Sequence, residues 1–420
     1  MLAENYSPEL ADSTRPRVVL IGASVLNDRV GAGVTLSALF HGWPPENLAQ
    51  IHTADEDPDP SVCGRSFRLE PVVTSAMTGR ARHMRNLART VSSFLSSEGL
   101  SPKLIRWLDD FRPQAVFSQL GDLATGRITL RVAGRYRIPL ALHISDDYMP
   151  GWPANAIGRE IPPITNLANW YLRKLFLKCA HTARRRMSIS TSMSQAYRER
   201  YGLEFSPFYN AVDPAEWPER LPAAVPLTRP VRIVYSGSIF HNGQFQALCD
   251  IRDAVMRLRE EGISIRLEIF TAQWSSQEHR NAFHMPPAVE IFDLVPKAKL
   301  RDNLTSADVL LLPVSFEPAA ISFIRHSIPG KVAEYLMCGT PVLAYGPKEV
   351  AQIQFLTERG CAEVVSERDG SALADAIRRL ATDEEHRVRL SARAREVALS
   401  EFNLPVLRER FQDAIATMVA

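Results

Sequence analysis

The sequence has few cysteines, and no two of them are close together. No C-x-x-C pair occurs among the five cysteines, which are Cys63, Cys179, Cys249, Cys338 and Cys361. This spacing argues against a structural zinc site and against a disulfide framework, and it fits a reducing cytosol.

The sequence also lacks long apolar runs and a large excess of charge of one sign. No run of about 18 uncharged apolar residues occurs, so no membrane-spanning helix is expected. Residues 1–16 are polar and predict a disordered tail without the apolar core of a signal peptide. The formal net charge of +2 is too small to indicate nucleic-acid binding. We therefore expect a cytoplasmic protein that at most lies on the inner surface of a membrane.

The chain is long enough for two domains, since it has 420 residues. Short apolar runs, typical of strands buried on both faces of a parallel sheet, alternate with helical patterns in both halves. The predicted strands are 18–22, 115–117, 140–144 and 187–190, then 231–235, 265–271, 289–292, 309–313 and 341–344. The predicted helices are 80–94 and 166–186, then 245–261, 299–307, 331–337, 350–359, 370–381, 384–401 and 404–420.

This alternation predicts an α/β protein with two doubly wound parallel sheets, each Rossmann-like, that face a cleft. A proline-rich stretch, residues 213–230, is typical of a linker. We therefore predict a first domain at 17–212 and a second domain at 231–400. The remaining residues, 401–420, are predicted to form a helix that packs back on the first domain.

The segment from Ser327 to Pro341 carries the clearest chemical signal. Ser327 suits a helix N-cap, and Pro329 is tolerated in a first helical turn. The free N–H groups of such a helix start favour a phosphate anion, and Lys331 adds a positive charge. Glu334 shares a helix face with Lys331 and could accept hydrogen bonds from ribose hydroxyls. The alternative is a capped helix with a surface Lys–Glu pair.

Several motifs together resemble the retaining nucleotide-sugar glycosyltransferases of the GT-B fold, glycosyltransferase family 4 in particular. Glu334 to Val342, which reads EYLMCGTPV, is similar to the segment that carries the family's ribose-binding glutamate. The stretches 307–313 and 210–213, ADVLLLP and NAVD, resemble a family strand and the domain crossover. The resemblance implies GT-B architecture and transfer of a sugar from a nucleoside-diphosphate donor to an acceptor hydroxyl. It also implies a role in bacterial surface polysaccharide or glycolipid assembly.

The sequence departs from the family pattern at two places. The first of two glutamates that family members place eight positions apart falls at His326, between Arg325 and Ser327. After the first strand of the second domain, the family has an arginine and a lysine on the diphosphate, whereas this chain has Ser238 and Gly243. The charge of the diphosphate must then be met by Lys331, Arg325 and the helix start.

The resemblance implies a set of site residues in both domains. The residues expected to act in catalysis are Lys331, His143 and His326. The residues expected to bind the donor are Gly237, Ser238, Arg325, Ser327, Ile328, Lys331, Glu334 and Gly33. Taken without the resemblance, Gly33 fits a tight turn between a strand and a helix, and His143 fits a structural histidine at a strand end.

The expected partners are the nucleotide-sugar donor and a saccharide or lipid-linked acceptor, with no metal and no further cofactor. The acidic triplet 55–57 is interpreted as a solvated loop rather than a metal motif. Basic and apolar residues mix in 170–178, which could contact an anionic membrane or could only face solvent beside the core. Two other functions fit the same fold: a non-catalytic partner subunit, and a nucleotide-sugar epimerase.

Overall fold

The computed structural model of the protein describes residues 15–22, 24–27, 31–69, 99–120, 123–145, 147, 162–217 and 230–419. By internal contacts, the chain divides into two units. The first comprises Met1–Ile144, Pro153–Met187 and Arg408–Ala420, and the second comprises Ser145–Trp152 and Ser188–Leu407. The predicted helix 80–94, most of the predicted tail and residues 218–229 of the proline-rich stretch lie outside the described residues.

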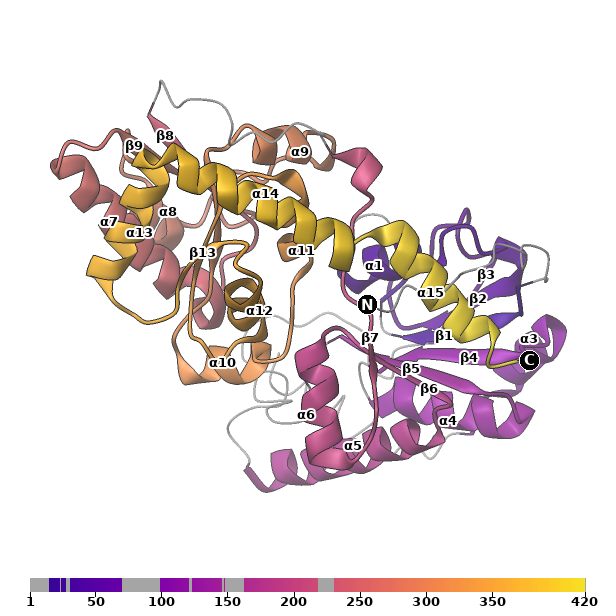
Figure 1. Ribbon diagram of the computed structural model, residues 1–420. Coiled ribbons are helices and arrows are strands. Elements are labelled where there is room, and N and C mark those ends of the chain that lie inside the picture. The colour runs from indigo at the N-terminus through magenta and orange to yellow at the C-terminus, as the bar shows by residue number, and fades with distance from the viewer. Residues whose placement is uncertain are drawn as a thin grey trace. The chain divides into compact units, whose positions relative to one another are not determined.

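The first sheet has seven strands in the order β3-β2-β1-β4-β5-β6-β7 (Figure 1). The strands are β1 (Val18–Gly22), β2 (Leu48–His52), β3 (Arg65–Arg68), β4 (Ala115–Gln119), β5 (Leu140–Ile144), β6 (Arg185–Ser188) and β7 (Ser206–Pro207). Every residue of β1, β2, β4 and β5 is buried, as expected of parallel strands covered on both faces.

The helices in the described part of the first unit are α1 (Gly31–Phe40), α3 (Pro102–Phe111), α4 (Leu123–Tyr136) and α5 (Pro162–Thr182), together with the end of α15 (Leu404–Ala416). The end of α15 packs on this unit through Phe411, whose ring lies 5.1 Å from Phe40 and 5.5 Å from Phe117. Gln412 adds hydrogen bonds of 3.0 Å to the carbonyls of Leu39 and His41. The last helix therefore completes the core of the first unit.

The second sheet has six strands in the order β10-β9-β8-β11-β12-β13. They are β8 (Val231–Ser236), β9 (Ile265–Phe270), β10 (Val289–Phe292), β11 (Val309–Pro313), β12 (Val342–Tyr345) and β13 (Glu363–Val365). All neighbouring strands in this sheet pair in parallel. The order reverses between β8 and β11, and ligands of such sheets bind at the carboxyl ends of the strands at that reversal.

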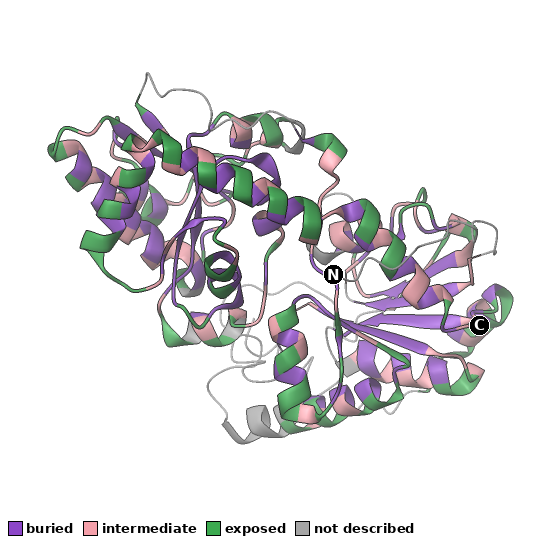
Figure 2. Cartoon of the chain, viewed as in Figure 1, coloured by how far each residue is buried: buried purple, intermediate pink, exposed green. Residues whose placement is uncertain are grey.

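Helices cover both faces of the second sheet, and Figure 1 shows α7 and α13 side by side on one of them. This layer holds α7 (Gln246–Glu260), α8 (Gln277–Phe283) and α13 (Gly370–Thr382). The other holds α9 (Lys297–Thr305), α11 (Gly330–Cys338), α12 (Ala351–Arg359) and α14 (Glu384–Glu401). Successive strand residues alternate between the two layers, since Ile233 belongs to the first and Val234 to the second. Figure 2 shows these strands buried and an outer face of α14 exposed.

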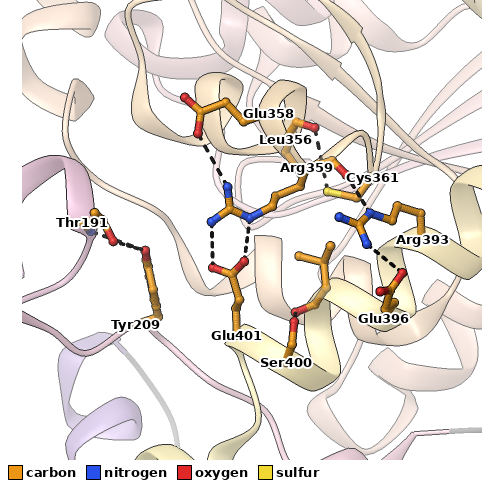
Figure 3. Close-up of polar contacts among 11 residues, drawn as sticks. Thr191, Tyr209, Leu356, Glu358, Arg359, Cys361, Arg393, Glu396, Ser400 and Glu401 are labelled. Carbon is orange, nitrogen blue, oxygen red and sulfur yellow. Dashed lines mark hydrogen bonds and ion pairs between the residues drawn. The ribbon is translucent and has the colours of Figure 1, made fainter. Parts of the chain in front are cut away.

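Polar contacts fix the end of α12 to α14 (Figure 3). Arg359 donates to Glu401 at 2.6 Å, and its carbonyl accepts a hydrogen bond of 2.8 Å from Arg393. In the same view, Tyr209 shares a hydrogen bond of 2.6 Å with Thr191, the first residue of α6 (Thr191–Tyr201). The Tyr209 contact holds the chain directly before Asn210, which reaches the candidate site.

The structure adds elements that the sequence did not predict, namely β2, β3, β7 and β13 and the helices α3, α4, α8 and α10 (Pro318–Ile324). It also corrects the predicted strand 187–190. β6 ends at Ser188, and the side chain of Ser190 accepts a hydrogen bond from the Met193 N–H as the N-cap of α6. A serine at this point satisfies an N–H group that the helix itself leaves unpaired.

Candidate functional site

The candidate site lies where β8 ends, beside the start of α11. Gly237 follows β8 with φ of +149°, a conformation that favours glycine. A Cβ atom placed on Gly237 would lie 2.6 Å from Cε of Lys331 and closer still to Nζ. The absence of a side chain at Gly237 therefore lets the Lys331 ammonium lie against the backbone at the strand end.

Lys331 has spare hydrogen-bonding capacity. Its Nζ donates to the Tyr235 hydroxyl at 3.3 Å and lies 4.6 Å from the centroid of the Tyr235 ring, a cation–π contact. An ammonium has three N–H donors, and Tyr235 is its only hydrogen-bond acceptor within the described part of the chain. Burial lowers the pKa of Lys331 to about 8, while the charge of Glu334 opposes that shift. The group is thus a partly desolvated cation, which attracts an anion more strongly than a solvated one.

Two buried tyrosines hold the turn at Gly237. The Tyr235 hydroxyl donates to the Ser238 carbonyl at 2.6 Å, and the Tyr335 hydroxyl donates to the Ser236 carbonyl at 3.5 Å. Burial raises the pKa of both hydroxyls, so each stays neutral and can donate. Tyr235 of β8 and Tyr335 of α11 therefore hold in place the backbone that faces Lys331.

Helix α11 begins without a side-chain cap. Its first residue is Gly330 and its N-cap is Pro329, which has no side-chain acceptor. The prediction that Ser327 is the N-cap is therefore wrong: the cap is Pro329, in an extended conformation, and the helix begins two residues later than a Ser327 cap requires. The Ser327 hydroxyl is buried and has no hydrogen-bond partner in the described structure. The uncapped N–H groups at this end of α11 are available to an anion beside Lys331.

The segment before α11 is anchored by Asn210, a contact that the sequence did not predict. The Asn210 amide donates to the Ile328 carbonyl at 3.2 Å, while the Ile328 side chain lies in the core. Arg325 is exposed, and its carbonyl accepts from the Ala351 N–H at 2.7 Å. Ile328 can therefore offer a ligand its backbone N–H but not its side chain, and Arg325 offers its side chain from the surface.

His326 is held through its ring and its main chain. Its Nδ1 lies 2.9 Å from the Ser192 hydroxyl, its Nε2 lies 3.9 Å from Asp147, and its carbonyl accepts a hydrogen bond from Ser190. Burial lowers the pKa of His326, although the charge of Asp147 raises it in part. The structure thus places His326, Ser327, Lys331 and the Gly237 turn in one unit, within or beside the entry to α11.

The two remaining site residues, His143 and Gly33, belong to the first unit. His143 is buried, its ring stacks on Phe117 with centroids 6.2 Å apart, and burial lowers its pKa to about 4. Neither ring nitrogen has a hydrogen-bond partner among the described residues. The histidine therefore stays neutral near pH 7, and its contact with a donor sugar stays a prediction.

Gly33 does not lie in a glycine loop. It lies in the first turn of α1, which begins at Gly31, and not in a turn between a strand and a helix as the sequence suggested. A Cβ atom on Gly33 would collide with the Val25 carbonyl and the Asn27 amide. Close approach between α1 and the preceding loop explains this glycine, and its contact with donor phosphates stays a prediction.

The acidic loop at 55–57 has the arrangement of a surface loop. Asp55 pairs with Arg68, and Asp57 accepts a hydrogen bond of 3.1 Å from Ser66; both aspartates are exposed. Among the described residues, no three His, Cys, Asp or Glu side chains are grouped to hold a metal ion. In the same part of the chain, no helix combines the length and apolar character needed to cross a membrane.

Comparison with known proteins places the candidate site inside a recognised domain. Residues 230–383, which contain β8 and α11, match the family profile described as "Glycosyl transferases group 1". A search of curated protein sequences found no match.

Solved structures share the fold over nearly the full chain. Sucrose-phosphate synthase from Thermosynechococcus elongatus is 15% identical with a TM-score of 0.64, over 94% of this chain and 97% of that one. HepE from Anabaena in complex with UDP is 12% identical with a TM-score of 0.64, over 96% and 100%. WaaG, a glycosyltransferase involved in lipopolysaccharide biosynthesis, is 14% identical with a TM-score of 0.61, over 95% and 99%. The two parallel-sheet units have the GT-B fold, and together with the family match they support a glycosyltransferase.

Proposed function

We propose that the protein transfers a sugar from a nucleoside-diphosphate donor to a hydroxyl group of a second substrate. The observation that carries this proposal is the Lys331 ammonium. It lies against the Gly237 backbone with two N–H donors unused by the described residues, beside the uncapped start of α11. A cation and free N–H groups at the reversal point of a parallel sheet suit a diphosphate.

The chemistry requires a site of this kind, because the bond to the sugar breaks as negative charge builds on the departing diphosphate. Donors fixed in place beforehand stabilise that charge without reorganising, and removing one such donor costs roughly 3 kcal/mol in comparable sites. Lys331 supplies the full charge, and the α11 start with the Gly237 turn supplies neutral N–H groups. Ser238 and Arg325 complete the expected diphosphate contacts.

The other site residues keep the roles that the motif resemblance implies. Glu334, partly buried one turn along α11 from Lys331, would accept hydrogen bonds from the ribose hydroxyls. His326 and His143 would lie beside the donor sugar, and Gly33 would approach the phosphates. We propose retention of configuration and family 4 membership on the same resemblance, with no metal ion required.

The proposed substrates follow from the similar solved structures and from the motif resemblance. HepE structures contain UDP or UDP-glucose, so a uridine nucleotide is the first donor to test. A saccharide or lipid-linked acceptor in bacterial surface polysaccharide or glycolipid assembly follows from the resemblance. A cytoplasmic location fits this role, because nucleotide sugars and reduced cysteines both belong to that compartment.

Contact with the inner membrane surface is proposed for the exposed side of α5. Trp170 is 56% exposed, and the Lys174 ammonium lies 5.6 Å from its ring centroid. Arg173 and Lys178 are exposed on the same helix. Cations around an exposed tryptophan suit an anionic lipid surface. Co-sedimentation with phosphatidylglycerol vesicles should fall when Trp170 and Lys174 are both replaced by alanine; unchanged sedimentation would refute the contact.

The proposed function is tested with a panel of UDP-, GDP-, ADP- and dTDP-sugars, with and without acceptor mixtures. We expect hydrolysis or transfer with one donor and loss of that activity in Lys331→Ala. Equal activity in both proteins would refute the role of Lys331. No nucleotide binding by calorimetry would favour the non-catalytic partner subunit, a reading motivated by the missing cations at Ser238 and Gly243. Conversion of the donor to a different nucleotide sugar without acceptor would favour the epimerase.

A further inference from the structure

The buried carboxylate of Asp147 faces the His326 ring and accepts hydrogen bonds from two side chains. The Asp147 side chain is 1% exposed and receives a two-pronged contact from Arg200, with N–O distances of 3.1 and 2.7 Å. The Tyr197 hydroxyl donates to the same carboxylate at 3.2 Å. A paired geometry of this kind fixes the plane of a carboxylate more firmly than a single contact does. Arg200 and Tyr197 therefore fix the orientation of the Asp147 carboxylate.

The first turn of α6 holds His326 from another side. Ser190, the N-cap, donates its hydroxyl to the His326 carbonyl. Ser192, two residues on, lies 2.9 Å from His326 Nδ1. One helix terminus thus contacts both the main chain and the ring of His326, four residues before Gly330 begins α11.

We propose that Asp147 is a positioning residue, held by Arg200 and Tyr197, that orients the His326 imidazole at the entry to the donor-binding helix α11. In this arrangement Nε2 carries the proton and faces Asp147, and Nδ1 accepts from the Ser192 hydroxyl. The inference rests on the proposed function, because the orientation of His326 affects donor binding only if the donor binds beside it.

The chemistry of the ring supports this tautomer. A neutral imidazole has one N–H and one acceptor nitrogen, and a carboxylate can only accept. A carboxylate attracts an N–H and repels a lone pair, so the facing Asp147 favours the proton on Nε2 and leaves Nδ1 to accept from the Ser192 hydroxyl. At 3.9 Å, the Nε2–Asp147 contact orients the ring electrostatically rather than as a direct hydrogen bond. Ser192 thus supplies the only short contact to the ring among the described residues.

The charges around His326 come from three parts of the second unit. Asp147 raises its pKa, as does Glu199 of α6, while Arg200 of α6 and the neighbouring Arg325 lower it. Burial, the largest influence, also lowers the pKa. Neutralising Asp147 removes the nearest negative charge and leaves Arg200 unpaired, and both changes disfavour the imidazolium.

The first test does not depend on activity. Histidine resonances of the full chain, labelled with ¹³C and ¹⁵N, are followed by NMR over pH in wild type and in Asp147→Asn. The His326 resonance is assigned by its loss in His326→Asn. We expect its titration to move to lower pH in Asp147→Asn, with loss of the preference for a proton on Nε2. An unchanged titration and tautomer would overturn the proposal. Asp375→Asn, an exposed aspartate paired with Arg378, is the control and should leave His326 unchanged.

The second test is a double-mutant cycle read by UDP-glucose affinity in calorimetry, because His326 is proposed to lie beside the donor sugar, which UDP lacks. Asp147→Asn should weaken UDP-glucose binding about tenfold in the wild-type background, the size of one lost charge-assisted contact between His326 and the donor. The same substitution should have no further effect with His326→Asn, because asparagine places an amide near Nδ1 and nothing near Asp147. With His326→Gln, whose amide can reach the Nε2 position, part of the effect should remain. An equal effect in all three backgrounds would mean that Asp147 acts only through general stability, and would overturn the proposal.

The NMR titration and the binding cycle together distinguish a failure of this inference from a failure of the proposed function. If no nucleotide binds, the proposed function fails, and the NMR titration alone decides whether Asp147 orients His326. Where Asp147→Asn does not fold, Tyr197→Phe removes one hydroxyl donor to Asp147 and keeps the buried ring. This substitution should change the pH midpoint of the His326 titration or the fraction of the ring that carries its proton on Nε2. A spectrum identical to that of the wild type would contradict the proposal.

Discussion

Replacing Lys331 by methionine should make the unliganded protein more stable and the nucleotide complex weaker. Methionine has a similar length and no charge, so it removes the cost of holding a cation in a partly buried place. The native pKa of Lys331 is about 8, against an ordinary value of 10.5. Since one pKa unit corresponds to 1.36 kcal/mol, the native protein carries this cation near pH 7 at a cost of roughly 3 kcal/mol. The lost cation–π contact offsets about 1 kcal/mol, so we expect a net gain of about 2 kcal/mol.

The pH dependence of stability gives an independent check. Between pH 8 and 10.5, unfolded Lys331 keeps its proton while native Lys331 releases it. The unfolded state then binds more protons, so the free energy of unfolding of the wild type should rise with pH across this window. The Lys331→Met protein should lack that contribution. Urea unfolding of both proteins from pH 7 to 10 measures the difference.

The affinity should change in the opposite direction. Loss of a charged donor to a diphosphate costs about 2 kcal/mol, which is roughly a 30-fold weaker UDP affinity. Wild-type affinity should itself fall as pH rises through about 8, because only the protonated amine attracts the anion. Lys348→Met, an exposed lysine of the same unit, is the matched control and should change neither quantity. A destabilised Lys331→Met protein that keeps wild-type affinity would show that Lys331 is neither a strained cation nor a contact of the diphosphate.

Three further substitutions test the geometry around this site. Gly237→Ala should displace Lys331 and weaken UDP binding at least tenfold. The control is Gly262→Ala, where φ is +89° and the space around an added Cβ is open, so this substitution should lower only stability. Similar losses of affinity in both variants would mean that the clash with Lys331 is not the cause. Tyr235→Phe removes the acceptor of the Lys331 ammonium and the donor to the Ser238 carbonyl, and should lower stability by about 1 kcal/mol in thermal unfolding; no change would mean that neither contact forms in solution. Ser327→Ala should leave stability unchanged or slightly higher, because its buried hydroxyl has no described partner, whereas a loss of about 1 kcal/mol would restore Ser327 as a helix cap.

The fold was predictable where strands are buried on both faces. Runs such as residues 309–313 contain no polar residue, and the structure has a strand there with the same bounds. The strand β2 was missed because Gln50 and His52 interrupt its apolar run. Its two polar side chains are buried nonetheless, and the Gln50 amide bonds the loop after β1. Such burial depends on partners distant in sequence, which no local pattern reveals.

The candidate site was predictable in part. The residue types in the sequence indicated Lys331 and a nearby helix start, and the structure shows Lys331 against the Gly237 backbone, while the role of Lys331 toward a diphosphate stays a prediction. The contacts of Asn210 and Asp147 were not predicted, because each joins residues more than 100 positions apart. A signal existed for Asn210, since its motif resembles a family crossover, but only coordinates show that its amide holds the entry to α11.

A nucleoside diphosphate is proposed to bind between the Gly237 turn and the start of α11, and a crystal structure of the protein with UDP is the decisive measurement. We expect density for the diphosphate within hydrogen-bonding distance of Lys331 Nζ and the first N–H groups of α11, with the ribose beside Glu334. A diphosphate bound elsewhere on the chain, with the Lys331 ammonium unengaged, would show that this site does not bind the donor.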